Sequence, residues 1–161
     1  MINIQKSTLD AVLGCYKPSA RYLKSAELEY PTITGVFEIS QPCYIHDTGH
    51  FNAVDLLICY NQLSYAGLAE AGQKGIIPEL GIITLEEFKA LQLQNMLIVH
   101  VDKMRFKEPI STTNRIRGTI KVEKVIPGRI NRPYFFKTAY NFENGKATGE
   151  IDLALIRTKQ D

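Results

Sequence analysis

The feature that most constrains this 161-residue chain is an unbroken stretch at residues 52–70 that contains no proline. Its apolar positions recur at helical spacing: Val54, Leu57, Ile58, Tyr65 and Leu68. Further apolar side chains extend around most of the helix: Leu56, Cys59, Leu63, Ala66 and Ala69. A helix that is apolar on nearly every side requires other elements to enclose it.

The surrounding segments predict mostly strands. Partial alternation at residues 21–30 and 32–40 favours two strands or one interrupted pair. A shorter amphipathic helix is predicted at residues 84–94, with Thr84 as its N-cap and Glu86 and Glu87 in its first turn. The period then changes to two at residues 97–106, 115–126, 134–142 and 147–156, and Asn144-Gly145 is a hairpin signal. Four consecutive strands predict an antiparallel meander.

This order of elements predicts an α+β hot-dog fold, in which an antiparallel β-sheet wraps around a long central helix. A cystatin-like roll has the same order and stays open as an alternative. We expect residues 1–161 to form one domain, given the length of the chain. Because a sheet of this kind has open edges, we also expect a homodimer or a higher homo-oligomer.

Composition narrows the class of protein further. Hydrophobic residues make up 45% and charged residues 22%, as in a soluble globular domain. The apolar runs are too short to cross a membrane, and no secretory signal is visible at the start. The three cysteines form no Cys-x-x-Cys pair, which indicates free thiols and a cytoplasmic protein.

Positive charge is concentrated in one segment. Residues 102–137 carry ten Lys or Arg against three acids, although the net charge of the chain is only +2. This asymmetry favours a phosphate-bearing or acidic partner, but solvated strand faces would give the same pattern. We expect no nucleic-acid binding, because no recognised binding motif accompanies the small net charge.

Metal and cofactor chemistry receive little support from the motifs. The chain lacks a Gly-x-Gly-x-x-Gly loop, a Walker loop, a Gly-x-Ser-x-Gly elbow and a His-Glu-x-x-His pair. His46, Asp47 and His50 lie close together in sequence, but no fourth ligand accompanies them. We therefore expect no metal and no cofactor.

The chemistry-bearing residues gather around the long helix. Gly49-His50-Phe51-Asn52 precedes it, and Asn61-Gln62 lies about three turns inside. Each residue also has a structural interpretation. Asn52 suits a helix N-cap, His50 a loop hydrogen bond, and Asn61 with Gln62 a polar pair at a subunit contact. Tyr44 and Tyr65 suit core aromatics whose hydroxyls find a partner.

Two motifs carry a family resemblance. Tyr-Ile-x-x-Thr-Gly-His-Phe-Asn-Ala-Val and Asn-Gln-Leu-x-Tyr, read between Tyr44 and Tyr65, resemble the signature of the FcoT-type hot-dog thioesterase family. The similarity continues in Met96-Leu97-Ile98, Arg105-Phe106-Lys107-x-Pro109 and Gly149-Glu150-Ile151-x-Leu153. The resemblance implies long-chain acyl-thioester hydrolysis or, in isonitrile lipopeptide pathways, addition of glycine to an enoyl-carrier-protein thioester.

The resemblance implies that Tyr44, Asn52, Asn61 and Tyr16 are active-site residues, and His50 is a further catalytic candidate. Both reactions place negative charge on the thioester oxygen and need an oxyanion site. We expect unpaired first-turn amides near Asn52 and Ala53 to supply it, with the Tyr44 hydroxyl in front.

Asn61 cannot accept a proton as a carboxylate does, so in hydrolysis it must orient water or bind the carbonyl. Glycine addition needs instead a cation for the glycine carboxylate, and the candidates are Arg105, Lys107, Arg21 and Lys17.

Hydrolysis of acyl-CoA or acyl-carrier-protein thioesters is the leading prediction. Glycine addition is the alternative, and a non-catalytic module that binds an acyl chain or a carrier protein is the third interpretation. Phosphopantetheine would suit the basic residues 103–117. Large apolar side chains could line an acyl channel between helix and sheet, or form the core: Tyr16, Phe51, Tyr60, Phe88, Leu91 and Leu93.

Overall fold

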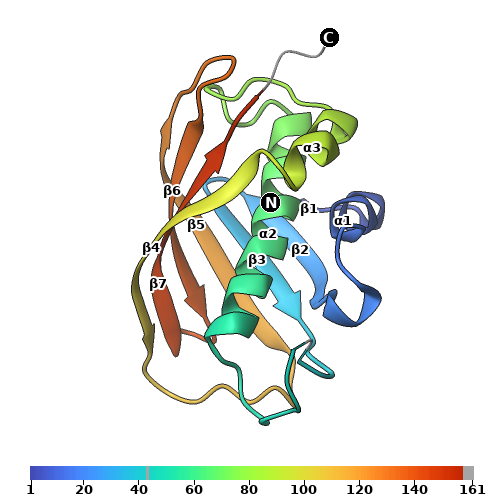
Figure 1. The fold of residues 1–161 in the computed structure, drawn as a ribbon, viewed down its shortest axis with the longest axis vertical. Helices are drawn as coiled ribbons and strands as arrows, with labels where there is room; N and C mark the ends of the chain where they lie inside the picture. Colours follow the sequence, from blue (N-terminus) through green and yellow to red (C-terminus); the bar gives the residue numbers. More distant parts are fainter. Residues whose placement is uncertain (43, 158–161) are drawn as a thin grey trace.

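The computed structural model describes residues 1–42 and 44–157, so Cys43 lies outside the described residues. One antiparallel sheet and three α-helices dominate the structure (Figure 1). In chain order the elements are β1 (Ile2–Asn3), α1 (Lys6–Leu13), the 3-10 turn η1 (Pro18–Ala20), β2 (Leu23–Glu29), β3 (Thr32–Phe37), α2 (Ala53–Gln73), α3 (Leu85–Gln92), β4 (Met96–Phe106), β5 (Ile116–Ile126), β6 (Tyr134–Phe142) and β7 (Ala147–Leu155).

The sheet curves around α2. Its seven strands have the order β1-β2-β3-β5-β6-β7-β4, and every neighbouring pair is antiparallel. Figure 1 shows α2 lying across the inner face of the sheet, with α1 on the opposite side of α2 from β5 to β7. The α+β class and the central helix predicted from the sequence are both observed.

The enclosure of α2 follows from its apolar circumference. Leu56, Cys59, Tyr60 and Leu63 have no exposed surface. Gly67 lets the helix approach β3, since a Cβ atom there would lie 2.3 Å from Ile33 Cδ1. The helix ends at Gln73, three residues beyond the predicted end.

The meander prediction is wrong for the first of its four strands. β5, β6 and β7 do form consecutive hairpins, but β4 pairs with β7 at the far edge of the sheet. Residues 107–115 between β4 and β5 contain no two-residue hairpin turn and instead pass beneath the start of α2, where Phe51 N donates to Ile110 O at 2.8 Å. Periodicity fixes which segments are strands, whereas the connections decide which strands become neighbours.

The first helix was missed altogether. Leu9, Val12 and Leu13 of α1 are buried at spacings of three and four residues, which is a helical pattern over a single short segment. Gln92 of α3 fixes this helix from the other side by donating to Val12 O at 2.5 Å.

β4 leaves an apolar edge uncovered. Leu97, Val99 and Val101 are 44%, 50% and 40% exposed, and two register shifts interrupt the pairing of β4 with β7.

None of the helices in the described part of the chain combines the length and the apolar character that crossing a membrane requires.

Candidate active site

The centre of the candidate site is a contact between two residues far apart in sequence. Asn61, on the half-buried face of α2, donates through Nδ2 to the Tyr16 hydroxyl at 3.0 Å. Tyr65 lies one turn further along α2, and its ring centroid is 6.4 Å from that of Tyr16. Tyr16 is brought there by α1, the helix that immediately precedes it.

Asn61 prepares the Tyr16 hydroxyl as a hydrogen-bond donor. Burial chiefly, and the neighbouring Tyr65 next, raise the pKa of Tyr16 well above its usual value, although the Asn61 hydrogen bond partly offsets this. The hydroxyl therefore keeps its proton at neutral pH. Because its oxygen already accepts from Asn61, its own O–H can point toward another acceptor.

Asn61 also acts on the second tyrosine. Burial raises the pKa of Tyr65, and a hydrogen bond from Asn61 again lowers it in part. The Tyr65 hydroxyl donates to Gln92 O at 3.1 Å. Asn61 Nδ2 donates to the Tyr16 hydroxyl, and within residues 1–42 and 44–157 no hydrogen bond is donated to the Asn61 side-chain oxygen.

Gln62 and Asn61 are neighbours in sequence but have different roles. Asn61 contacts Tyr16 in the candidate site, whereas Gln62 has a structural role. Gln62 has no exposed surface; its Oε1 accepts from Tyr22 N at 3.0 Å and Leu23 N at 2.9 Å, and its Nε2 donates to Ala20 O at 2.6 Å. These bonds fix the segment leading into β2 against α2.

The expectation of unpaired amides at the start of α2 is wrong for Asn52, Val54 and Asp55, whose backbone N–H groups are hydrogen-bonded. Asn52 is the N-cap, and its Oδ1 accepts from Val54 N at 2.9 Å and Asp55 N at 3.2 Å. Asp55 Oδ2 accepts in return from Asn52 N at 3.4 Å, which completes a capping box. The Asn52 and Asp55 side chains thus accept from most of the backbone N–H groups that an oxyanion would need. Asn52 is a helix N-cap, as its structural interpretation predicted.

The five predicted catalytic residues fall into two groups. Tyr16 and Asn61 meet in the middle of α2, whereas Asn52 caps the helix nine residues earlier, about 14 Å away along the axis. His50 and Tyr44 lie in the loop before α2; His50 is exposed and pairs in an isolated bridge with Ser111, and Tyr44 is 46% exposed. Within residues 1–42 and 44–157, no hydrogen bond joins His50 to Asn61.

Sequence reasoning missed Asp55. This carboxyl group has no exposed surface, and its Oδ1 has no hydrogen-bond partner. Desolvation raises the pKa of Asp55 and Asp47 adds to the rise, while the Asn52 backbone hydrogen bond and His50 oppose it. The spacing Asn52-x-x-Asp55 is a capping-box signal that could have identified the carboxyl's structural partner.

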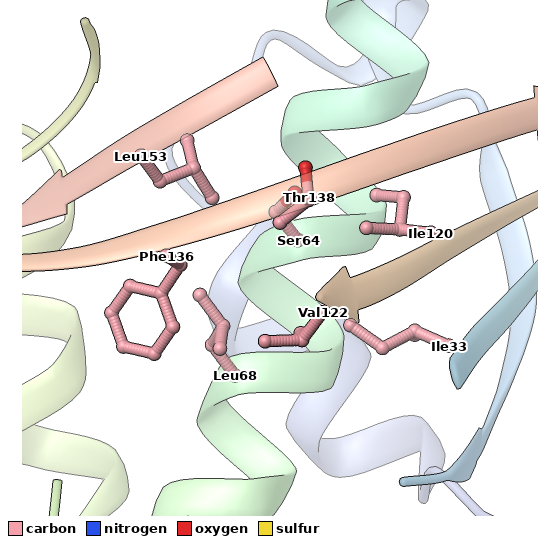
Figure 2. A pocket seen from close by; sticks show the side chains of 8 residues that line it. All are labelled: Ile33, Ser64, Leu68, Ile120, Val122, Phe136, Thr138 and Leu153. Carbon is pink, nitrogen blue, oxygen red and sulfur yellow. The ribbon is translucent and has the colours of Figure 1, made fainter. Parts of the chain in front are cut away.

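The space between α2 and the sheet is closed. Figure 2 shows the gap there, which we call the helix–sheet slot; it is lined by Ile33, Ser64, Leu68, Ile120, Val122, Phe136, Thr138 and Leu153. The slot is too narrow for a water molecule. Of the large apolar side chains that the sequence offered for either an acyl channel or the core, Phe51, Tyr60 and Phe88 pack in the core, whereas Leu93 is 68% exposed.

Four of the ten cations of residues 102–137 form ion pairs with acids. The pairs are Lys103 with Glu150, Arg115 with Glu38, Lys121 with Glu123, and Lys137 with Asp152. The solvated-face interpretation therefore accounts for part of this segment.

Arg21 differs from the other candidates for the glycine carboxylate. Its Nε donates to Tyr16 O at 3.1 Å, and among residues 1–42 and 44–157 no acid forms an ion pair with it. The other three candidates, Lys17, Arg105 and Lys107, have no side-chain hydrogen bond to Tyr16 or Asn61 within the described residues. The same part of the chain contains no cluster of three His, Cys, Asp or Glu side chains suited to a metal ion.

A long helix wrapped by an antiparallel sheet defines a hot-dog fold. Zebra fish thioesterase superfamily member 2 shares this fold with a TM-score of 0.54 at 10% identity, and the match covers 94% of each chain. A mutant thioesterase from Pseudomonas aeruginosa gives a TM-score of 0.52 at 10% identity, covering 97% of this chain and 99% of the other.

The chain belongs to the family of the FcoT-like thioesterase domain, whose model matches residues 11–155. A Streptomyces coeruleorubidus protein named (2E)-enoyl-ACP glycyltransferase is 36% identical over 161 residues, covering 94% of this chain and 96% of the relative. A protein of the same name from Mycobacterium marinum is 34% identical over 148 residues, covering 89% and 78%. The family resemblance read from the sequence is confirmed, and the relatives are named as enzymes.

Proposed function

We propose that this protein is an acyl-thioester-processing enzyme that adds glycine to an enoyl-carrier-protein thioester. The observation that carries the proposal is the Asn61–Tyr16 hydrogen bond, which presents a protonated hydroxyl beside a free amide carbonyl. The names of relatives at 34–36% identity favour glycine addition over the hydrolysis that the sequence first suggested.

The addition needs no redox partner and no leaving group. The neutral amine of glycine attacks the β-carbon, so that a carbon–nitrogen bond forms while the π bond of the alkene breaks. The displaced electron pair passes to the thioester oxygen as an enolate. The amine then loses a proton and the α-carbon gains one, and the thioester is retained.

The site would stabilise the enolate by hydrogen bonding. Tyr16 donates its O–H to the thioester oxygen, and Asn61 holds the hydroxyl in place. The free Asn61 carbonyl oxygen accepts from the attacking amine and orients it. Arg21, fixed by Tyr16 O, binds the glycine carboxylate as a charge-assisted pair. Asn52 supports the site from a distance by capping α2, and we propose no direct contact for Tyr44 or His50.

Hydrolysis is the second candidate, because the family is described by its thioesterase domain. The same oxyanion donor would serve water attack on the carbonyl carbon. Asn61 offers no proton-accepting carboxylate there, so a hydrolase would depend on positioning alone.

Intact-mass spectrometry separates the two reactions. An enoyl-carrier protein incubated with glycine should gain the mass of one glycine and keep its thioester. Release of free carrier thiol would support hydrolysis, and an unchanged substrate would contradict both.

We also propose that two copies pair through the β4 edge. Three exposed apolar side chains on an open edge strand, Leu97, Val99 and Val101, favour pairing with a second copy. Light scattering should report a dimer for the wild type and a shift toward monomer for Val99→Lys. A monomeric wild type would contradict this proposal.

A further inference from the structure

A groove on the outer side of the molecule takes part in the chemistry described above only through Arg21, which is one of its lining residues. It lies between α1 and the start of β2 and has a volume of about 450 Å³, within the range of ligand pockets. Its apolar lining is formed by Ile4, Leu9, Leu13 and Leu23, and its polar lining by Lys6, Asp10, Arg21, Lys24 and Ser25. We call it the α1–β2 groove.

The charges of this groove are available to a ligand. Lys6 and Lys24 are exposed, and within residues 1–42 and 44–157 no acid forms an ion pair with either. Lys24 Nζ donates to a backbone oxygen, that of Arg21, at 3.1 Å. Against these two lysines and Arg21 stands one acid, Asp10, so the groove has an excess of positive charge.

The groove adjoins the candidate active site. Arg21 belongs to its lining, and the same side chain donates to Tyr16 O. Tyr16 in turn receives the Asn61 hydrogen bond. The Arg21 side chain therefore joins the lining of the groove to the backbone of Tyr16, the residue whose hydroxyl is proposed to bind the thioester oxygen.

We propose that the α1–β2 groove binds the phosphopantetheine arm on which the thioester substrate is carried, with Lys6 and Lys24 binding its phosphate. This inference rests on the proposed function, since it names where the substrate's carrier arm binds. The arm combines an anionic phosphate with a branched apolar segment and amides, which matches cations above an apolar floor. The basic residues 103–117, expected earlier to bind this arm, contain Lys103 and Arg115, which are already paired with acids.

Calorimetry with two ligands tests the assignment without requiring turnover. The double variant Lys6→Glu/Lys24→Glu should bind 4′-phosphopantetheine at least about tenfold more weakly than the wild type, because two attractions become repulsions. Pantetheine, which lacks the phosphate, should bind both proteins equally. High salt should reduce the difference for the phosphorylated ligand.

A matched control separates local contacts from net charge. Lys89→Glu/Lys124→Glu makes the same change in charge on α3 and β5, outside the groove, and should bind 4′-phosphopantetheine as the wild type does. Unchanged binding by the groove variant would overturn the proposal. Equal loss of pantetheine binding would also overturn it, since that result indicates damaged structure rather than a lost phosphate contact.

Two carrier forms decide the source of the phosphate contact. The groove variant should raise the KM for enoyl-CoA and for enoyl-carrier protein alike, because both contain the same arm. A rise in KM for the enoyl-carrier protein alone would indicate that Lys6 and Lys24 contact the surface of the carrier protein and not the arm. That result would overturn the proposal. A wild type that binds 4′-phosphopantetheine but turns over no thioester would retain the groove and contradict the proposed function.

Discussion

Gln62→Leu tests whether one buried side chain fixes the segment that positions the site. Leucine has a similar volume but cannot form the three hydrogen bonds that Gln62 makes to Tyr22 N, Leu23 N and Ala20 O. Tyr22 N and Ala20 O keep the 3.1 Å bond between them, whereas Leu23 N loses the partner that Gln62 provides. One unsatisfied buried group costs about 1–3 kcal/mol, so the variant should lose about 1–3 kcal/mol.

Urea unfolding followed by circular dichroism measures this loss as a free energy of unfolding. Gln73→Leu on the same helix is the control, because Gln73 is half-buried and makes one bond, to Ala69 O at 3.2 Å. Its effect should stay within about 0.5 kcal/mol. A loss below about 1 kcal/mol for Gln62→Leu would refute the reasoning, since the segment would then be held by other contacts.

Two further predictions concern packing and ionisation along α2. Gly67→Ala should destabilise the protein by about 1–3 kcal/mol in urea unfolding, because the new Cβ would meet Ile33. Gly72→Ala is the control and should be neutral or stabilising, because its Cβ stays 3.4 Å from Ile83. Equal effects of the two substitutions would contradict the packing argument. Asp55→Asn should gain stability relative to the wild type as pH rises above about 4, because desolvation raises the folded-state pKa of Asp55 and its ionisation then opposes folding. A difference in unfolding free energy that stays constant between acid and neutral pH would contradict this.

The elements of the fold were largely predictable, because each depends on a local pattern. The apolar circumference of residues 52–70 is sufficient to predict a buried helix, and alternation identifies the long strands. The position of β4 was not predictable in this way. Its pairing with β7 depends on a nine-residue connection, residues 107–115, that carries no two-residue hairpin signal. The short helix α1 gave too few periods for its pattern to stand out.

The candidate site was predictable only in part. The motifs identified Asn61, and the family resemblance added Tyr16, but their contact joins residues 45 positions apart and depends on the missed helix α1. Asn52 suits a helix N-cap and also belongs to the family motif, so the sequence alone left a structural and a catalytic role open. The burial of Asp55 could not be predicted from the sequence, because it is a property of the tertiary structure.

A double-mutant cycle on Tyr16→Phe and Asn61→Ala, read as kcat for glycine addition to an enoyl-carrier protein, tests the central claim most directly. If Asn61 acts by holding the Tyr16 hydroxyl, each single variant should lower kcat by about 10²- to 10³-fold. The double variant should then be little worse than the more damaged single one, because the two residues act as a unit. Losses that multiply, or a kcat that survives Tyr16→Phe unchanged, would contradict the account.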